Sequence, residues 1–179
     1  MENKKDIIAE QFKKHFKHFG FKKTSVDTVA KELNFSKKTI YQFFNSKEKI
    51  FYYIISKIAN QFKNNMEKKL EVYSSYQEKI ENLLGMIFSE TRKWLKKNDA
   101  FEFKYKFEIS SLAFKDAYFQ LLVKLISGGM DNKEFHHASP EIKAQFIQGI
   151  ITESMKIQSI NNDLKLEDEV IQSVIKILT

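Results

Sequence analysis

Residues 25–43 read Ser-Val-Asp-Thr-Val-Ala-Lys-Glu-Leu-Asn-Phe-Ser-Lys-Lys-Thr-Ile-Tyr-Gln-Phe, and their pattern is the most informative local signal in the chain. Ser25 is a good N-cap for a short helix whose apolar residues recur at helical spacing. Asn34 follows at a tight turn, because asparagine tolerates a left-handed backbone. Ser36 can cap another short helix over about residues 37–43. We therefore predict two short amphipathic helices joined by a tight turn, which is a helix-turn-helix.

The segments on either side of this motif have the periodicity of helices as well. A first helix is expected from about residue 4 to residue 19, with Gly20 as its stop. Its apolar face holds Ile8, Phe12, His15, Phe16 and Phe19. Asn45 and Ser46 are expected to break the third helix and cap a long fourth one. Later helices are expected over about residues 77–97, 100–127, 140–158 and 166–178.

Residues 101–109 have a different pattern, in which apolar and polar residues alternate with the period of a β-strand. A lone strand would have no pairing partner elsewhere in the chain, so we expect a helix here too. The chain has 5 Gly and 1 Pro, few helix breakers for 179 residues. These observations predict an all-α fold. A three-helix helix-turn-helix domain, which is the type that binds DNA, is expected over residues 1–46, joined to a helical domain over residues 47–179.

The residue types of the chain argue against catalysis and against a metal or other cofactor. There is no cysteine, so disulfides, cysteine zinc sites and thiol catalysis are excluded. The 4 His residues do not form a metal-binding motif, and no P-loop or serine-centred elbow occurs. We expect no enzyme. No signal-peptide core and no membrane-length apolar run is present, which predicts a cytoplasmic protein without a membrane partner.

The positive charge of the chain is concentrated at its N-terminal end. Residues 1–50 hold 12 Lys and 6 acidic residues, whereas residues 51–179 hold 18 basic and 17 acidic residues. Such asymmetry suggests a polyanionic partner for the first part of the chain. A generally lysine-rich composition is the alternative, since 29 of the 30 basic residues are Lys. Charge alone leaves both interpretations open.

Three segments form a recognisable pattern: residues 24–30 (Thr-Ser-Val-Asp-Thr-Val-Ala), 35–44 (Phe-Ser-Lys-Lys-Thr-Ile-Tyr-Gln-Phe-Phe) and 46–50 (Ser-Lys-Glu-Lys-Ile). They closely resemble the N-terminal domain of the TetR family of bacterial transcriptional regulators. The resemblance extends over about residues 7–55 with unbroken spacing. Asn34 stands where the family usually has Gly, and Phe35 is larger than the usual Val. The resemblance implies a homodimeric regulator, usually a repressor, whose C-terminal domain binds an inducer.

The third helix is the expected reader of the major groove of double-stranded DNA. Lysine can donate to guanine, glutamine can pair with adenine, and tyrosine can pack on a thymine methyl group or reach a phosphate. The predicted DNA-binding residues are Thr24, Ser25, Ser36, Lys37, Lys38, Thr39, Tyr41, Gln42 and Lys47. Among them Thr39 and Lys47 are expected to bind the backbone, and Thr24 or Ser25 could do the same. For each lysine a solvated surface charge is the alternative.

The last two helices, over residues 140–158 and 166–178, are the expected dimer surface. With their symmetry mates they would form a four-helix bundle that places two recognition helices about 34 Å apart on a palindromic operator. Their apolar faces could instead serve the intramolecular core. A pocket for a small apolar or aromatic ligand is expected among Met86, Phe88, Trp94, Phe103, Phe107, Phe114 and Tyr118. A packed core is the alternative interpretation of these residues.

The sequence leaves several functions open beside that of a ligand-released repressor. A ligand-independent regulator or an activator would carry the same motif. A helical protein–protein adaptor would have the same fold, but there Lys37, Lys38, Tyr41 and Gln42 would be replaceable without loss of function.

Overall fold

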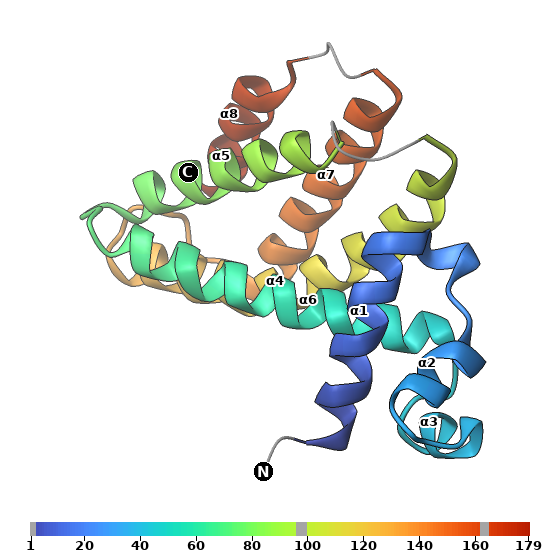
Figure 1. Ribbon diagram of the computed structural model, residues 1–179. Helices are drawn as coiled ribbons and strands as arrows, with labels where there is room; N and C mark the ends of the chain where they lie inside the picture. The colour runs from blue at the N-terminus through green and yellow to red at the C-terminus, as the bar shows by residue number, and fades with distance from the viewer. Residues whose placement is uncertain (1–2, 96–99, 162–164) are drawn as a thin grey trace. The chain divides into compact units, whose positions relative to one another are not determined.

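The computed structural model describes residues 3–95, 100–161 and 165–179, and leaves the side chains of residues 94–107 and 159 undescribed. Within these limits the fold is all-α, as predicted, with eight helices shown in Figure 1. They are α1 (Lys4–Lys23), α2 (Val26–Glu32), α3 (Lys37–Phe43), α4 (Lys47–Leu70), α5 (Tyr76–Leu95), α6 (Ala100–Asp131), α7 (Pro140–Ile160) and α8 (Glu167–Leu178). No helix among the described residues is long and apolar enough to cross a membrane.

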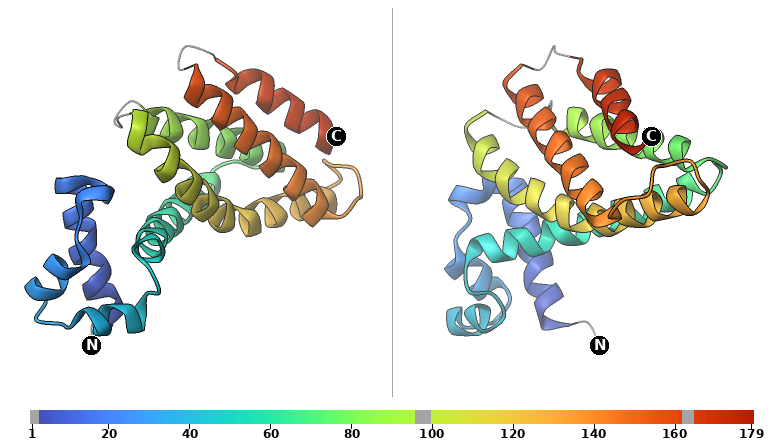
Figure 2. Two further views of the ribbon diagram at one scale, coloured as in Figure 1. Left: turned by 90° about the vertical axis from the view of Figure 1, so that its right-hand side faces the viewer. Right: turned by 180° about the vertical axis from the view of Figure 1, so that it is seen from behind.

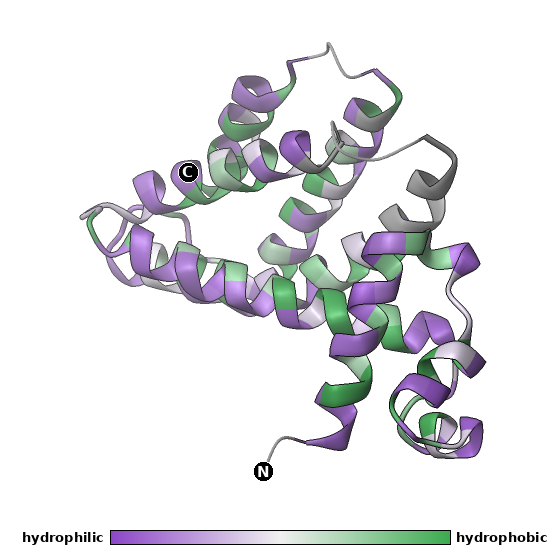
Figure 3. Cartoon of the chain, in the orientation of Figure 1, coloured by the Kyte–Doolittle hydropathy of each residue, from purple (hydrophilic) through white to green (hydrophobic). Residues whose placement is uncertain are grey.

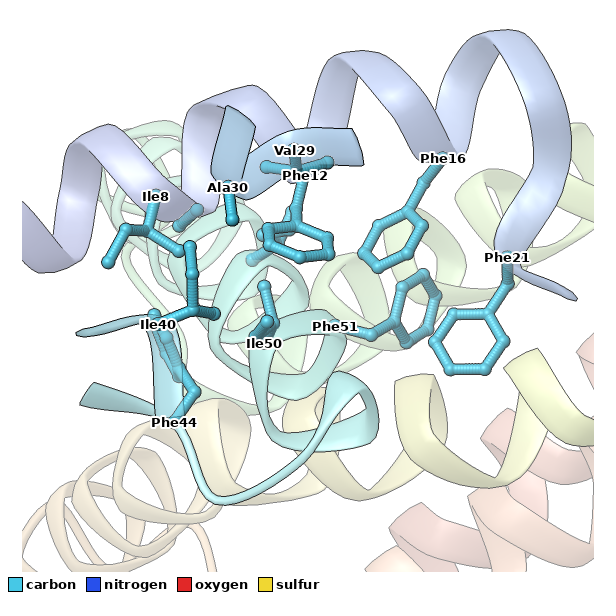
Figure 4. Close-up of a cluster of buried hydrophobic side chains, with 12 residues drawn as sticks. Ile8, Phe12, Phe16, Phe21, Val29, Ala30, Ile40, Phe44, Ile50 and Phe51 are labelled. Atoms are coloured by element: carbon cyan, nitrogen blue, oxygen red, sulfur yellow. The ribbon is translucent and has the colours of Figure 1, made fainter. Parts of the chain in front are cut away.

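One compact unit comprises Met1–Ala59 and Phe101–Phe114. Its core lies between α1, α2, α3 and the first half of α4, as Figure 4 shows. The buried members of this core are Ile8, Ala9, Phe12, Phe16, Phe21, Val29, Ala30, Ile40, Phe44, Ile50, Phe51 and Ile54. Ile109 of α6 is partly buried against the same cluster. The predicted boundary between residues 46 and 47 follows the sequence motif, whereas this unit continues into α4 because Ile50 and Ile54 belong to its core.

The second compact unit comprises Asn60–Ala100 and Lys115–Thr179. Within it α5 packs against both α7 and α8, and α7 and α8 run side by side, as Figure 2 shows. Fully buried side chains come from several helices, among them Leu83 and Phe88 of α5, Leu122 of α6, Ile147 of α7 and Val174 of α8. Ser139 caps α7 by accepting a hydrogen bond from the Ile142 backbone N–H at 3.3 Å, and Pro140 follows at the first helical position, as the sequence predicts.

The structure bears out one expectation for the first helix and corrects another. Gly20 interrupts the helix as expected, since its φ of 80° and ψ of 163° are not helical, and a short helical segment after this kink extends α1 to Lys23. The positive φ is one that glycine adopts at no steric cost. The kink also changes which aromatic ring faces inward: Phe19, expected on the buried face, is 50% exposed, and Phe21 is buried in its place.

The structure also corrects the expected end of the long sixth helix. The sequence predicts an end near residue 127, before Gly128 and Gly129, yet α6 continues through both glycines to Asp131. A Cβ atom at Gly128 would overlap the Tyr76 ring, and one at Gly129 would overlap the Phe135 ring. These glycines therefore allow close packing inside a helix. The alternating residues 101–109 are helical, as predicted.

Candidate DNA-binding interface

The backbone of the helix-turn-helix is fixed by the side chains that the sequence singles out. Ser25 accepts the Thr28 backbone N–H at the start of α2, and Ser36 accepts the Thr39 backbone N–H at 3.0 Å at the start of α3. Between the helices Asn34 has φ 54°, the left-handed conformation predicted for it. The Phe35 backbone N–H then donates to the Ala30 carbonyl at 2.9 Å and closes the turn. The angle between α2 and α3 is thus set by local hydrogen bonds.

The two faces of α3 differ sharply in polarity. Ile40 on the inner face is 0% exposed. The outer face exposes Lys37, Lys38, Tyr41 and Gln42, and polar and apolar residues interleave along α2 and α3 in Figure 3. A short, rigid helix with exposed long polar side chains can enter a major groove and donate to base edges. The structure therefore brings four of the predicted DNA-binding residues onto one exposed surface.

Lys37 has a partner that the sequence did not reveal. Its ammonium lies 3.0 Å from the Asp27 carboxylate across the turn between α2 and α3, with both side chains more than half exposed. The hydrogen bond to Asp27 and the attraction of its charge raise the pKa of Lys37 above its usual value. Ten residues separate the pair in sequence. No local pattern links residues at that distance, which is why the pairing was missed.

Lys47 is placed differently from the expected backbone anchor. At the start of α4, its ammonium donates to the carbonyl oxygens of Phe21 at 2.8 Å, Thr24 at 3.2 Å and Lys22 at 3.3 Å. It also lies 4.6 Å from the centroid of the Phe21 ring. An ammonium has three N–H donors, so each of them has an acceptor within the protein. This geometry favours a structural role, holding the end of α1 against the start of α4, over a phosphate contact.

The predicted hydroxyl contacts fall into two groups. Thr24 is 3% exposed, and its hydroxyl donates to the Gly20 carbonyl at 2.7 Å, so it already has a partner inside the fold. Ser25 and Ser36 are exposed, although each also caps a helix. The Thr39 hydroxyl is half-buried and lies 2.8 Å from that of Ser36. Ser25 and Ser36 therefore remain candidates for DNA contact, while Thr24 belongs to the scaffold.

Polar links that the sequence did not predict tie α1 to its neighbours. The Asp6 carboxylate accepts hydrogen bonds from Lys57 at 2.6 Å and from the Tyr53 hydroxyl at 2.7 Å, both on α4. The hydrogen bond from Lys57, followed in importance by the one from Tyr53, holds the pKa of Asp6 below its usual value. On α2, Glu32 pairs with His15 at 2.7 Å, and this bond lowers the pKa of Glu32. These links brace the scaffold that carries α3.

The predicted ligand-pocket residues are spread over both compact units. Phe88 is fully buried, Tyr118 is buried, and Met86 is half-buried, all in the second unit, while the half-buried Phe114 belongs to the first. Trp94, Phe103 and Phe107 lie outside the described side chains. Burial raises the pKa of the Tyr118 hydroxyl strongly. The apolar pocket therefore stays a prediction.

A polar surface pocket lies between α6 and α7 and was not predicted. It is lined by Lys115, Asp116, Phe119, Gln120, Gln145 and Gln148. Gln148 is 4% exposed and its amide donates to the Lys115 carbonyl at 2.7 Å. Among the described residues, no three His, Asp or Glu side chains lie together in a way that could hold a metal ion.

Taken alone, the fold and the exposed face of α3 define a helix-turn-helix DNA-binding domain. Residues 13–54 match the family model described as bacterial regulatory proteins, tetR family. An uncharacterized HTH-type transcriptional regulator of Bacillus subtilis, YhgD, is 34% identical over 85 residues. That alignment covers 48% of this chain and 44% of YhgD, so the matched region is less than half the length of this relative.

Solved structures share the fold over nearly the whole chain. The fatty acid degradation regulator FadR of Bacillus halodurans has a TM-score of 0.67 at 20% identity, covering 98% of this chain and 96% of its own. FadR of Bacillus subtilis, solved with stearoyl-CoA, has a TM-score of 0.64 at 18% identity, with 96% and 98% covered. RolR, solved with resorcinol, has a TM-score of 0.76 at 9% identity, with 97% and 86% covered.

At these identities the solved structures establish the fold, while the family model and the curated relative identify the motif. The N-terminal part of the chain therefore carries the DNA-binding domain of the TetR family of bacterial regulatory proteins. The resemblance recognised in residues 24–50 is thereby confirmed.

Proposed function

We propose that the chain is a dimeric transcriptional repressor that reads a palindromic DNA operator with α3 and leaves it when a small, largely apolar ligand binds to the C-terminal domain. Such a protein acts where the chromosome lies, in the bacterial cytoplasm. The single observation that carries this proposal is the outer face of α3. Its side chains Lys37, Lys38, Tyr41 and Gln42 are exposed on a helix whose inner face is locked into a hydrophobic core.

DNA reading is tested by fluorescence anisotropy with the duplex that lies upstream of the protein's own gene. Specific DNA is expected to bind ~10³-fold or more tightly than a random duplex. Tyr41→Ala and Gln42→Ala should remove most of that preference, because they remove contacts to base edges. The matched control is Gln172→Ala on α8, which is also exposed but belongs to the second unit. Equal loss in the control would contradict the assignment of α3.

Dimerisation is supported by an exposed apolar stripe on α7. Ile142 is 52% exposed, Phe146 61%, Ile157 41% and Ile160 83%. Their spacing places them on one face of the helix. Gly149 lies on the same face, and a Cβ atom there would meet nothing within 4 Å in the chain. Large exposed apolar side chains that share one helix face mark an interaction surface, and a second copy of α7 would cover it symmetrically.

Ultracentrifugation of the wild type and of Phe146→Glu tests the dimer. The substitution places two charges at a self-complementary interface, so the variant should sediment as a monomer and lose operator affinity. Ile177→Glu on α8, which is 37% exposed, probes the second helix of the proposed surface. A wild-type chain that is monomeric at micromolar concentration would refute the dimer, and an unaltered dimer in both variants would refute this surface.

Ligand release is supported by the proteins that share the fold, since one is solved with stearoyl-CoA and another with resorcinol. Coupling between ligand and DNA sites is typically about 1–3 kcal/mol, which is about 5–150-fold in operator affinity. Stearoyl-CoA and resorcinol are therefore the first two probes. A probe that raises the melting temperature and weakens operator binding supports an inducible repressor. A probe that binds tightly without changing DNA affinity argues for a ligand-independent regulator, the second candidate.

A further inference from the structure

The outer surface of α2 and α3 carries an acidic residue among its lysines. Asp27 lies in the first turn of α2 and Lys37 is the first residue of α3, and their charged groups are 3.0 Å apart. The other acidic residue of this motif, Glu32, is hydrogen-bonded by His15 and Gln11 of α1. Of these two carboxylates, Asp27 is therefore the one that pairs with a predicted DNA-binding residue.

The ion pair between Asp27 and Lys37 is weak enough for another acceptor to replace Asp27. The Lys37 side chain is 52% exposed and that of Asp27 is 59% exposed, so water and salt screen their attraction. Exposed ion pairs contribute little to stability. A DNA phosphate or a guanine base edge offers Lys37 the same kind of charged or polar acceptor that Asp27 supplies. A DNA acceptor therefore competes with Asp27 for the charge of the Lys37 ammonium.

We propose that Asp27 is a specificity-determining residue, which keeps Lys37 from random phosphates and releases it when an operator base pair offers a better acceptor. This inference rests on the proposed function, because it requires that α3 reads DNA. On random duplex nearly all affinity comes from phosphate contacts, and there Lys37 stays on Asp27. On the operator, base contacts by Lys37 offset the loss of the pair. Asp27 therefore lowers non-specific affinity more than specific affinity.

The test compares Asp27→Asn with Glu10→Gln. Glu10 is an exposed acid on α1 that pairs with Lys13, so its replacement removes the same charge from the same unit without touching α2 or α3. Each variant is titrated with a random duplex and with the selected operator across a salt series. Melting temperatures confirm that both variants fold.

Asp27→Asn is expected to bind random duplex about 3–5-fold more tightly at low salt. The slope of log affinity against log salt should steepen by up to about 0.9, the value of one added phosphate contact. Operator affinity should change less, so the ratio of specific to random binding falls. Glu10→Gln should show none of these changes. In a Lys37→Met background the effect of Asp27→Asn should disappear.

Two results would overturn the inference while leaving the proposed function intact. In the first, the wild type discriminates its operator but Asp27→Asn behaves like Glu10→Gln. In the second, the effect of Asp27→Asn persists in the Lys37→Met background, which would mean that the carboxylate acts by general repulsion and not through Lys37. A wild type that prefers no sequence overturns the proposed function and this inference together.

Discussion

Replacement of Lys47 by methionine separates a structural role from a DNA contact. The Lys47→Met variant keeps a long apolar side chain but removes three hydrogen bonds to carbonyl oxygens at the end of α1. It also removes the contact of the ammonium with the Phe21 ring at 4.6 Å. Lys49→Met is the matched control, because Lys49 is an exposed lysine on the same helix.

The expected cost follows from these contacts. Hydrogen bonds from a charged group contribute about 1.5–3 kcal/mol net when buried, and a cation–aromatic contact at a solvated site adds about 0.5–1 kcal/mol. Lys47 is half-buried and one ammonium makes all three bonds, so we count them as a single charged interaction and take the lower end of each range. We expect Lys47→Met to lower the free energy of unfolding by about 2 kcal/mol, which is about 4–8 °C in melting temperature for a chain of this size.

Thermal unfolding and a salt series of DNA binding together distinguish a structural role of Lys47 from a phosphate contact. If Lys47 is structural, the melting temperature falls and operator affinity falls, while the salt slope is unchanged because no phosphate contact is lost. Lys49→Met should leave the melting temperature within about 1 °C of the wild type, as surface substitutions usually do. An unchanged melting temperature with a salt slope reduced by about 0.9 would contradict the structural role of Lys47, because it indicates a lost phosphate contact.

Three further predictions follow from other contacts. Asp6 has a lowered pKa, so its bonds stabilise the fold above its usual pKa and are lost as the pH falls through the lowered value; urea titrations should show that Asp6→Asn costs stability at pH 7 and that this cost shrinks as the pH falls below the usual pKa of aspartate. Gly129→Ala should destabilise by about 1–3 kcal/mol through overlap with the Phe135 ring, whereas Gly85→Ala, with open space around it, should stabilise by about 0.5–1 kcal/mol in the same melts. Gly149→Leu should raise helix stability but weaken the dimer in ultracentrifugation, and an unweakened dimer would show that two copies of α7 do not meet at this residue.

The local signals of the sequence predict the helix-turn-helix well. Ser25 and Ser36 cap helices that begin at the next residue, and Asn34 adopts a left-handed backbone at the turn. These roles depend only on neighbouring residues, so they can be inferred without knowledge of the tertiary fold. Residues 101–109 are helical, as predicted, although apolar and polar residues alternate there. A β-strand needs a second strand to pair with, and the sequence predicts no other strand.

Contacts between distant residues account for what the sequence did not predict. Gly128 is of a residue type that often ends a helix, but the ring that needs the space beside it belongs to Tyr76, far away in the sequence. Lys47 and Asp27 have ordinary local surroundings, and their partners lie 23–26 and 10 residues away. A charge can be recognised from sequence, whereas its partner depends on how the helices pack. This is why the exposed face of α3 was predicted and the pairing of Lys37 was not.

Selection of bound sequences from a pool of randomised duplexes with the purified chain tests whether α3 reads DNA. We expect an inverted repeat whose half-sites are about one helical turn apart. The repeat should be absent from the pools selected by Lys37→Ala and by Tyr41→Ala. A pool that stays random with the wild-type chain would contradict DNA reading by α3 and leave the adaptor hypothesis in its place.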